Sequence, residues 1–69
     1  MRQVYRYYCL GVSPMPGTVP PGVIGLEDYT ESVYCPQIEG NAWGHVDYET
    51  PLTENQIKHY DLSGPEVRV

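Results

Sequence analysis

The stretch Ala42-Trp43-Gly44-His45-Val46-Asp47-Tyr48-Glu49 decides the fold of this chain, because two kinds of residue alternate along it. Alternation with a period of two is typical of a β-strand whose two faces meet different surroundings. One face would carry Ala42, Gly44, Val46 and Tyr48, and the opposite face would carry Trp43, His45, Asp47 and Glu49. We therefore predict a strand over residues 42–49, with its small and apolar face turned toward a core.

Two further strands are predicted before this one. Residues 32–38 form the first arm of a hairpin, which Glu39-Gly40-Asn41 closes with residues that tolerate a tight turn. Pro36 lies within that arm and assigns it to the edge of a sheet, because proline cannot donate a ladder hydrogen bond. Residues 3–10 are rich in aromatic and β-branched side chains and predict a strand that is partly covered on both faces.

A Pro/Gly-rich segment separates these strands. Residues 11–25 hold four prolines and four glycines, which exclude a regular helix and a central strand. The segment is also too apolar for an ordinary linker. It is either a free loop or, as we predict, an ordered cover that lies across one face of the sheet.

A short helix follows Pro51. Thr53 is its expected N-cap and Gln56 stands three residues later, which is the spacing of a capping box, and Leu52 and Ile57 occupy the two hydrophobic staple positions. The tail at 63–69 is either frayed or one more short strand. Residues 1–69 thus predict a single α+β domain: a three-stranded, mostly antiparallel sheet with one short helix packed on one face and the Pro/Gly-rich segment over the other.

Composition narrows the classes of function. Nine acidic and four basic residues give a formal charge of −5, which argues against binding to nucleic acid, because phosphate contacts rest on Lys and Arg. No apolar run resembles a signal peptide or a membrane span, so we expect a cytoplasmic protein with no membrane partner. In that compartment thiols stay reduced.

The residue types of a zinc site are present without its spacing. Ligand pairs in such sites lie close in sequence, whereas here the candidates are far apart: Cys9, Cys35, His45 and His59. The two cysteines are interpreted as buried free thiols, with a Cys9–Cys35 disulfide as the alternative. Because no catalytic or cofactor-binding motif occurs either, we expect no metal, no cofactor and no enzymatic activity.

The predicted partner-binding site is the polar face of the 42–49 strand. It combines an aromatic side chain, an imidazole and two carboxylates, which suit a cation or a basic partner: Trp43, His45, Asp47 and Glu49. The alternative is a solvated sheet face on which Trp43 folds against the Pro/Gly-rich segment.

Three stretches carry a family resemblance: residues 14–20, Pro-Met-Pro-Gly-Thr-Val-Pro; residues 42–48, Ala-Trp-Gly-His-Val-Asp-Tyr; and residues 51–53, Pro-Leu-Thr. In that order they resemble small proteins carried on conjugative elements of Gram-positive anaerobes, some of them related to the defence-against-restriction protein DarA. The resemblance covers most of residues 5–62. It implies an accessory protein of a mobile element that helps incoming DNA evade restriction, and it assigns no functional residue. It leads us to expect an aromatic residue in place of His45, which weighs against a functional role for that imidazole.

Three hypotheses follow. The first is a non-enzymatic protein-interaction module of a mobile genetic element, with an unidentified protein partner. The second is an acidic decoy of DNA, which requires several carboxylates on one surface: Glu27, Asp28, Glu31, Asp47 and Glu49. The third is weak binding of single-stranded nucleic acid through interleaved basic and aromatic side chains: Arg2, Tyr5, Arg6, Tyr7 and Tyr8.

Overall fold

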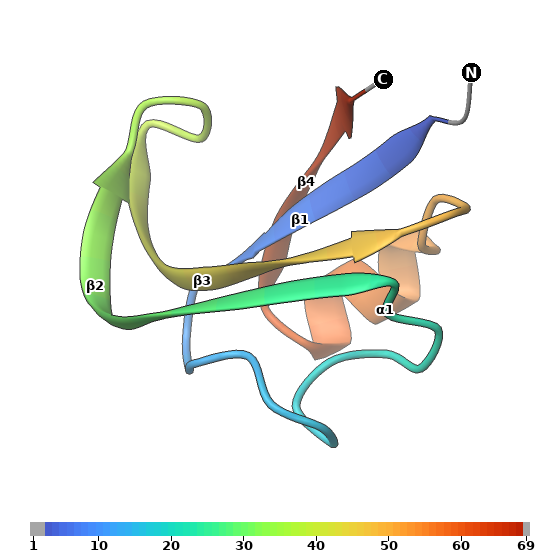
Figure 1. Cartoon of the computed structure of the whole chain (residues 1–69), viewed down its shortest axis with the longest axis horizontal. Coiled ribbons are helices and arrows are strands. Elements are labelled where there is room, and N and C mark those ends of the chain that lie inside the picture. Colours follow the sequence, from blue (N-terminus) through green and yellow to red (C-terminus); the bar gives the residue numbers. More distant parts are fainter. Residues whose placement is uncertain (1–2, 69) are drawn as a thin grey trace.

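The two central strands of the sheet, β1 (Val4–Cys9) and β3 (Gly40–Tyr48), are paired antiparallel with Tyr7 opposite Val46. Both of these side chains are completely buried. The computed structural model describes residues 3–68 (Figure 1). Its remaining elements are β2 (Gly25–Cys35), α1 (Glu54–His59) and β4 (Leu62–Arg68). The sheet order is β2-β3-β1-β4, and each neighbouring pair is antiparallel.

The prediction of three strands is wrong, because the described chain forms a four-stranded sheet. The additional strand, β4, takes up most of the tail at 63–69, for which the alternatives were a frayed end or one more short strand, and it contains Gly64 and Pro65. Proline is tolerated here because β4 lies at the edge of the sheet, where a missing N–H need not cost a ladder bond. A register shift in the β1–β4 pairing, between Arg6 and Tyr8, accommodates the irregular backbone at Gly64.

The predicted hairpin is present with different limits. Its first arm, β2, begins at Gly25 rather than at residue 32, and it ends at Cys35, so that Pro36 falls in the turn. The turn is held by hydrogen bonds from the amide of Ile38 to the carbonyl of Cys35 and from the amide of Glu39 to that of Pro36. The β2–β3 register shifts between Asp28 and Val33, where β2 bends (Figure 1).

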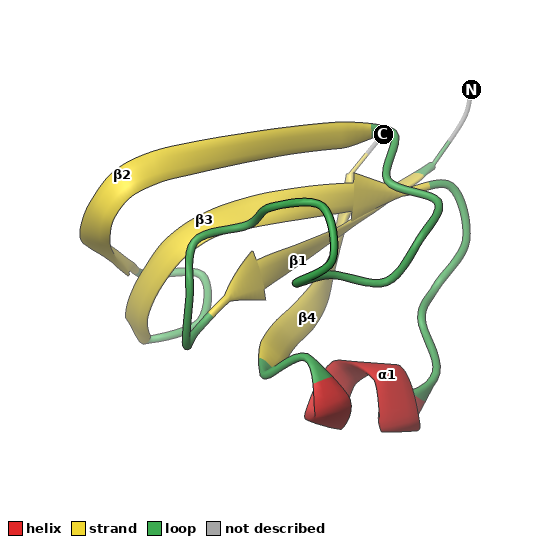
Figure 2. Ribbon diagram, turned by 90° about the horizontal axis from the view of Figure 1, so that it is seen from below, coloured by secondary structure: helices red, strands yellow, loops and turns green. Residues whose placement is uncertain are grey.

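The helix and the Pro/Gly-rich segment cover the same face of the sheet, and not opposite faces as predicted (Figure 2). Ile57 and Tyr60 pack against the same buried cluster as Val19 and Val23 from the Pro/Gly-rich segment. The cluster also takes side chains from the sheet: Tyr7, Cys9, Val46, Tyr48 and Leu62. One core therefore lies between the sheet and a composite layer of helix and extended chain.

The predicted capping box of α1 is confirmed. The Thr53 hydroxyl accepts a hydrogen bond from the amide of Gln56, and the Gln56 side chain accepts one from the amide of Thr53. No residue of α1 is fully buried, so the six-residue helix depends on this cap and on the partial burial of Ile57.

The other face of the sheet holds a smaller buried cluster of Tyr8, Cys35 and Ala42, with Tyr29 and Ile38 packed against it. Ala42 therefore departs from the predicted alternation, which had placed it on the same face as Val46. Beside this cluster the face is polar, and it includes His45 and Asp47 of the predicted site.

Candidate partner-binding surface

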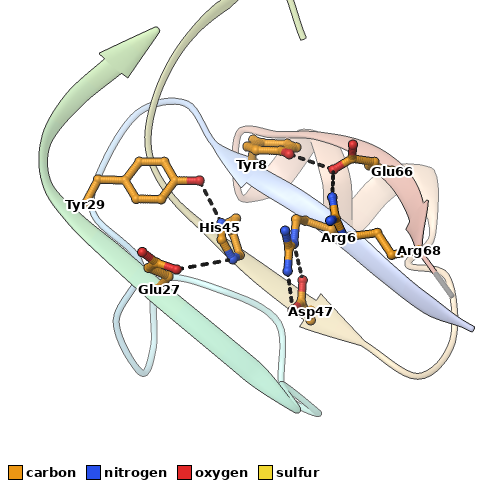
Figure 3. A network of polar contacts seen from close by, with 8 residues as sticks. All are labelled: Arg6, Tyr8, Glu27, Tyr29, His45, Asp47, Glu66 and Arg68. Carbon is orange, nitrogen blue, oxygen red and sulfur yellow. Dashed lines mark hydrogen bonds and ion pairs between the residues drawn. The ribbon is translucent and has the colours of Figure 1, made fainter. Parts of the chain in front are cut away.

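Strand β3 positions three of the four predicted site residues, and Glu49 follows directly after its end. His45 is buried at 9% exposure, Trp43 is half-buried, and Glu49 is exposed. The imidazole of His45 and the carboxylate of Asp47 lie on the same face, each in a polar contact of its own (Figure 3). The structure thus brings His45 and Asp47 together, and it engages both within the domain.

Asp47 is bound by Arg6, the residue directly opposite it on β1. The guanidinium donates two hydrogen bonds, from Nε to Oδ1 at 2.8 Å and from Nη2 to Oδ2 at 3.1 Å. The Asp47 hydrogen bond is the main reason that the already high pKa of Arg6 is raised further. Because both side chains are largely withdrawn from water, the pair fixes the packing of the central strands.

His45 is held as a neutral imidazole. Its Nδ1 lies 2.7 Å from the hydroxyl of Tyr29, and its Nε2 lies 3.9 Å from the Glu27 carboxylate. Burial lowers the pKa of His45, and the positive charge of Arg6 adds to this effect. The hydroxyl of Tyr29 and Nδ1 share one hydrogen bond, and the ring tautomer sets which of the two donates. Burial also raises the pKa of Tyr29, which keeps this hydroxyl protonated.

A second set of contacts joins β1 to β4. The Tyr8 hydroxyl donates to the Glu66 carboxylate at 2.7 Å, and Arg68 donates to the same oxygen at 3.2 Å (Figure 3). Burial, followed by the bond to Glu66, raises the pKa of Tyr8 to about 12. The same bond lowers the pKa of Glu66. The polar face is therefore a network in which acidic groups meet donors from neighbouring strands.

The four Cys and His residues considered for a metal do not form a site. Across residues 3–68 no group of three or more His, Cys, Asp or Glu could hold a metal ion. Cys9 and Cys35 are free thiols in different buried clusters, and burial raises the pKa of Cys9 to about 11. In the same described part, no helix is long and apolar enough to cross a membrane.

Of the three tyrosines proposed to stack on nucleic acid, Tyr5 is half-buried, and Tyr7 and Tyr8 are buried and not free to stack. Tyr7 and Tyr8 are 0% and 3% exposed and belong to different clusters, and Arg6 is occupied by Asp47. Arg2 lies outside the described residues.

Of the five carboxylates proposed for a decoy, four are exposed and Asp47 is half-buried: the exposed ones are Glu27, Asp28, Glu31 and Glu49. Asp47 is neutralised by Arg6, and Asp28 accepts a hydrogen bond from the amide of Thr30. Glu27 faces the imidazole of His45.

Sequence reasoning missed an apolar pocket on the helix-covered side of the sheet. Its volume is about 580 Å³, and the Pro/Gly-rich segment, Leu26 of β2 and Tyr60 beyond α1 form its walls. The apolar residues within the Pro/Gly-rich segment were the available signal, but Leu26 and Tyr60 join them only through the fold. Leu26 remains 45% exposed at this pocket.

Comparison with known proteins gives one family. Searches of curated proteins and of solved structures return no match. The family model described as "Defence against restriction A C-terminal" matches residues 2–65, and it spans all the elements described above except the end of β4. The chain therefore belongs to the defence against restriction A C-terminal family, and this membership links it to protection against restriction.

Proposed function

We propose that this chain is a non-enzymatic protein-interaction module, an accessory of a mobile genetic element, that contributes to defence against restriction by binding another protein. Family membership supports the role in defence. One structural observation supports the proposed mode of action. Exposed apolar side chains are concentrated in the N-terminal half of the chain.

Among residues 3–68, seven of the eight large hydrophobic side chains that remain exposed lie between residues 10 and 34: Leu10, Val12, Met15, Ile24, Leu26, Val33 and Tyr34. Tyr34 is 61% exposed and Met15 52%. The apolar pocket adjoins this half of the chain. Exposed apolar surface beside a pocket is typical of a surface that a protein partner covers.

The polar face takes a different part in this proposal. His45 and Asp47 support a partner surface by holding β3 against β1 and β2, because their polar atoms already contact Tyr29 and Arg6. Trp43 and Glu49 stay the predicted contact residues of that face.

The acidic-decoy alternative draws less support. A decoy of DNA needs an open row of negative charges, whereas Asp47, one of the five carboxylates proposed for it, is paired with Arg6.

The proposal is tested by capture of partners from host lysate with the tagged chain, with and without nuclease, and by mass spectrometry. Leu26→Ser and Tyr34→Ser each remove an exposed apolar side chain from the 10–34 part of the chain. The matched control is Val67→Ser, which removes a side chain of β4 that is 50% exposed. We expect a partner that survives nuclease, is retained by Val67→Ser and is lost with Leu26→Ser or Tyr34→Ser.

The same variants are then compared for protection of incoming DNA in restricting cells. Loss of protection with Leu26→Ser, with protection retained by Val67→Ser, would agree with the proposal. Loss of every captured protein on nuclease treatment, or equal capture by all variants, would contradict it.

A further inference from the structure

The outer side of strand β2 is an unprotected sheet edge. Among the described residues β2 pairs only with β3, and Figure 2 shows no element beyond it. Natural proteins usually blunt such an edge with proline, charged side chains, a bulge or a covering segment, and in β2 the bulge comes only after Asp28 and the charges are all acidic. Between Gly25 and Cys35 the sequence has no proline, lysine or arginine, and all but three of these residues are exposed. The opposite edge, β4, carries Gly64, Pro65 and Arg68.

The edge has an apolar side that continues into the pocket. Leu26 belongs to β2 and also lines the pocket, opposite Tyr60 and the Pro/Gly-rich segment. A strand added alongside β2 would place every second side chain on that same side. One apolar side chain of an added strand would therefore lie beside Leu26, over the pocket.

The other side of the same edge is acidic. Glu27 follows Leu26 and points to the opposite face, where its side chain is 66% exposed and 3.9 Å from the imidazole of His45. Since the pKa of His45 is lowered, this neighbour brings no full positive charge to Glu27 at neutral pH. A basic side chain on an added strand would supply one.

We propose that residues Gly25–Asp28 bind an extended segment of a protein partner by strand addition, with an apolar side chain of that segment over the pocket and an adjacent basic one beside Glu27. The bulge between Asp28 and Val33 limits the paired length to the first part of β2. The inference rests on the proposed function and specifies the chemistry of its partner. Backbone hydrogen bonds along the edge supply affinity, and the two side-chain positions supply specificity.

A second copy of the chain fits this edge less well. Antiparallel pairing of two β2 strands would bring Glu27 and Asp28 of one copy near those of the other, and like charges on neighbouring strands are destabilising. An opposite charge on the incoming strand removes this repulsion.

The test uses a short synthetic peptide in which valine and lysine alternate, titrated into the full chain and followed by NMR and amide hydrogen exchange. We expect shifts and slowed exchange confined to the Gly25–Asp28 amides and the pocket. A peptide that alternates valine and glutamate should bind about tenfold more weakly or worse. Glu27→Gln should reduce the preference for lysine, Leu26→Ser should weaken both peptides, and Val67→Ser should change neither.

Two N-methylated versions of the valine–lysine peptide test the backbone bonds. Only alternate N–H groups of an added strand face the edge, so methylation of one alternate set should abolish binding and methylation of the other should spare it. Equal tolerance of both sets, shifts that map outside β2, or no binding at millimolar peptide would overturn the proposal. A dimer paired through β2 in solution would overturn it in favour of a second copy. If partner capture still depends on Leu26 in any of these cases, the proposed function survives and only strand addition fails.

Discussion

The guanidinium of Arg6 on β1 and the carboxylate of Asp47 on β3 face each other across the centre of the sheet and form a two-point ion pair. The two side chains are 22% and 15% exposed. This position is too sheltered for the pair to be an ordinary surface salt bridge, whose contribution is small. The pair lies on the same face as His45 and the Tyr8–Glu66 contact, and the ring of Tyr8 meets that of His45 edge to face with centroids 6.0 Å apart (Figure 3).

Removing either partner should destabilise the fold, because the remaining charge loses its hydrogen bonds in a sheltered place. We expect Arg6→Met or Asp47→Leu to lower the free energy of unfolding by about 1–3 kcal/mol in urea denaturation. The double variant should lose less than the sum, with a coupling of about 1–2 kcal/mol. Arg68→Met, at an exposed contact with Glu66, is the control and should change stability by about 0.5 kcal/mol or less. Additive losses would show that the two residues act independently.

Gly44 is required by close packing against β2 and the Pro/Gly-rich segment. A side chain there would meet the backbone oxygen of Glu27 and, at 2.6 Å, the ring of Pro14. Gly44→Ala should therefore cost about 2–3 kcal/mol in thermal or urea unfolding, because backbone must move to admit a methyl group. Gly40 lies in the same strand with its nearest such neighbour at 3.8 Å. Gly40→Ala should stay within about 0.5 kcal/mol of wild type, and equal effects of the two variants would refute this account.

The elements that could be predicted from sequence are those that carry a local signal. The alternation around Val46 and Tyr48 located β3, and the spacing of Thr53 and Gln56 located α1 with its capping box. In both cases residues a few positions apart determine the structure, so the pattern is complete within a short window.

The fourth strand and the extent of β2 lacked such a signal. Only Cys35 is fully buried in β2, so its pairing with β3 leaves no hydrophobic period to detect. Gly64 and Pro65 are residues that usually end a strand. They are tolerated in β4 because that strand lies at the edge of the sheet.

The candidate site could be predicted only in part from the sequence, for a related reason. Arg6 and Asp47 are 41 positions apart, and Tyr8 and Glu66 are 58 positions apart. Strand order decides which of these residues meet, and the strand count was wrong. The pocket likewise depends on Leu26 and Tyr60 meeting the Pro/Gly-rich segment in space.

Loss of the helix cap should weaken the cover of the core. Thr53→Ala removes the acceptor of the Gln56 amide and should cost about 1 kcal/mol of stability, measured by thermal unfolding. Thr50→Ala, at an exposed position outside the helix, is the matched control and should have little effect. A Thr53→Ala variant as stable as Thr50→Ala would show that packing of Ile57 alone holds α1 in place.

Mild acid should destabilise the domain through His45. Its pKa in the fold lies below the ordinary value, so the unfolded chain binds more protons as pH falls below about 6.5. The stabilisation is complete above that pH and is lost as pH falls through the lower pKa of the folded state. Unfolding free energies measured between about pH 7 and pH 5 should therefore decline, and His45→Gln should flatten the decline. The lowered pKa of Glu66 adds a further loss only at more acidic pH. An unchanged slope in His45→Gln would assign the acid sensitivity to other groups.

The hydroxyl of Tyr48 should control how firmly the Pro/Gly-rich segment closes the core. It donates to the buried carbonyl of Pro20 at 2.7 Å, the polar bond that ties this part of the pocket wall to β3. Tyr48→Phe leaves that carbonyl without its donor and should cost about 1–3 kcal/mol. Amide exchange should quicken at Thr18, Val19 and Val23 more than in β1. Tyr34→Phe, which changes an exposed ring, is the matched control.

The Tyr48 hydroxyl also predicts the pH range in which the domain loses stability in alkali. Burial raises the pKa of Tyr48 to about 12, so its contribution is intact below about pH 10 and is lost as pH rises through about 12. Tyr48→Phe should thus be less sensitive to alkali than wild type, whereas Tyr34→Phe should match it. If Tyr48→Phe shows wild-type exchange in residues 18–23, apolar packing of Val19 and Pro20 is sufficient to hold the segment, and the hydroxyl is not what keeps the pocket wall in place.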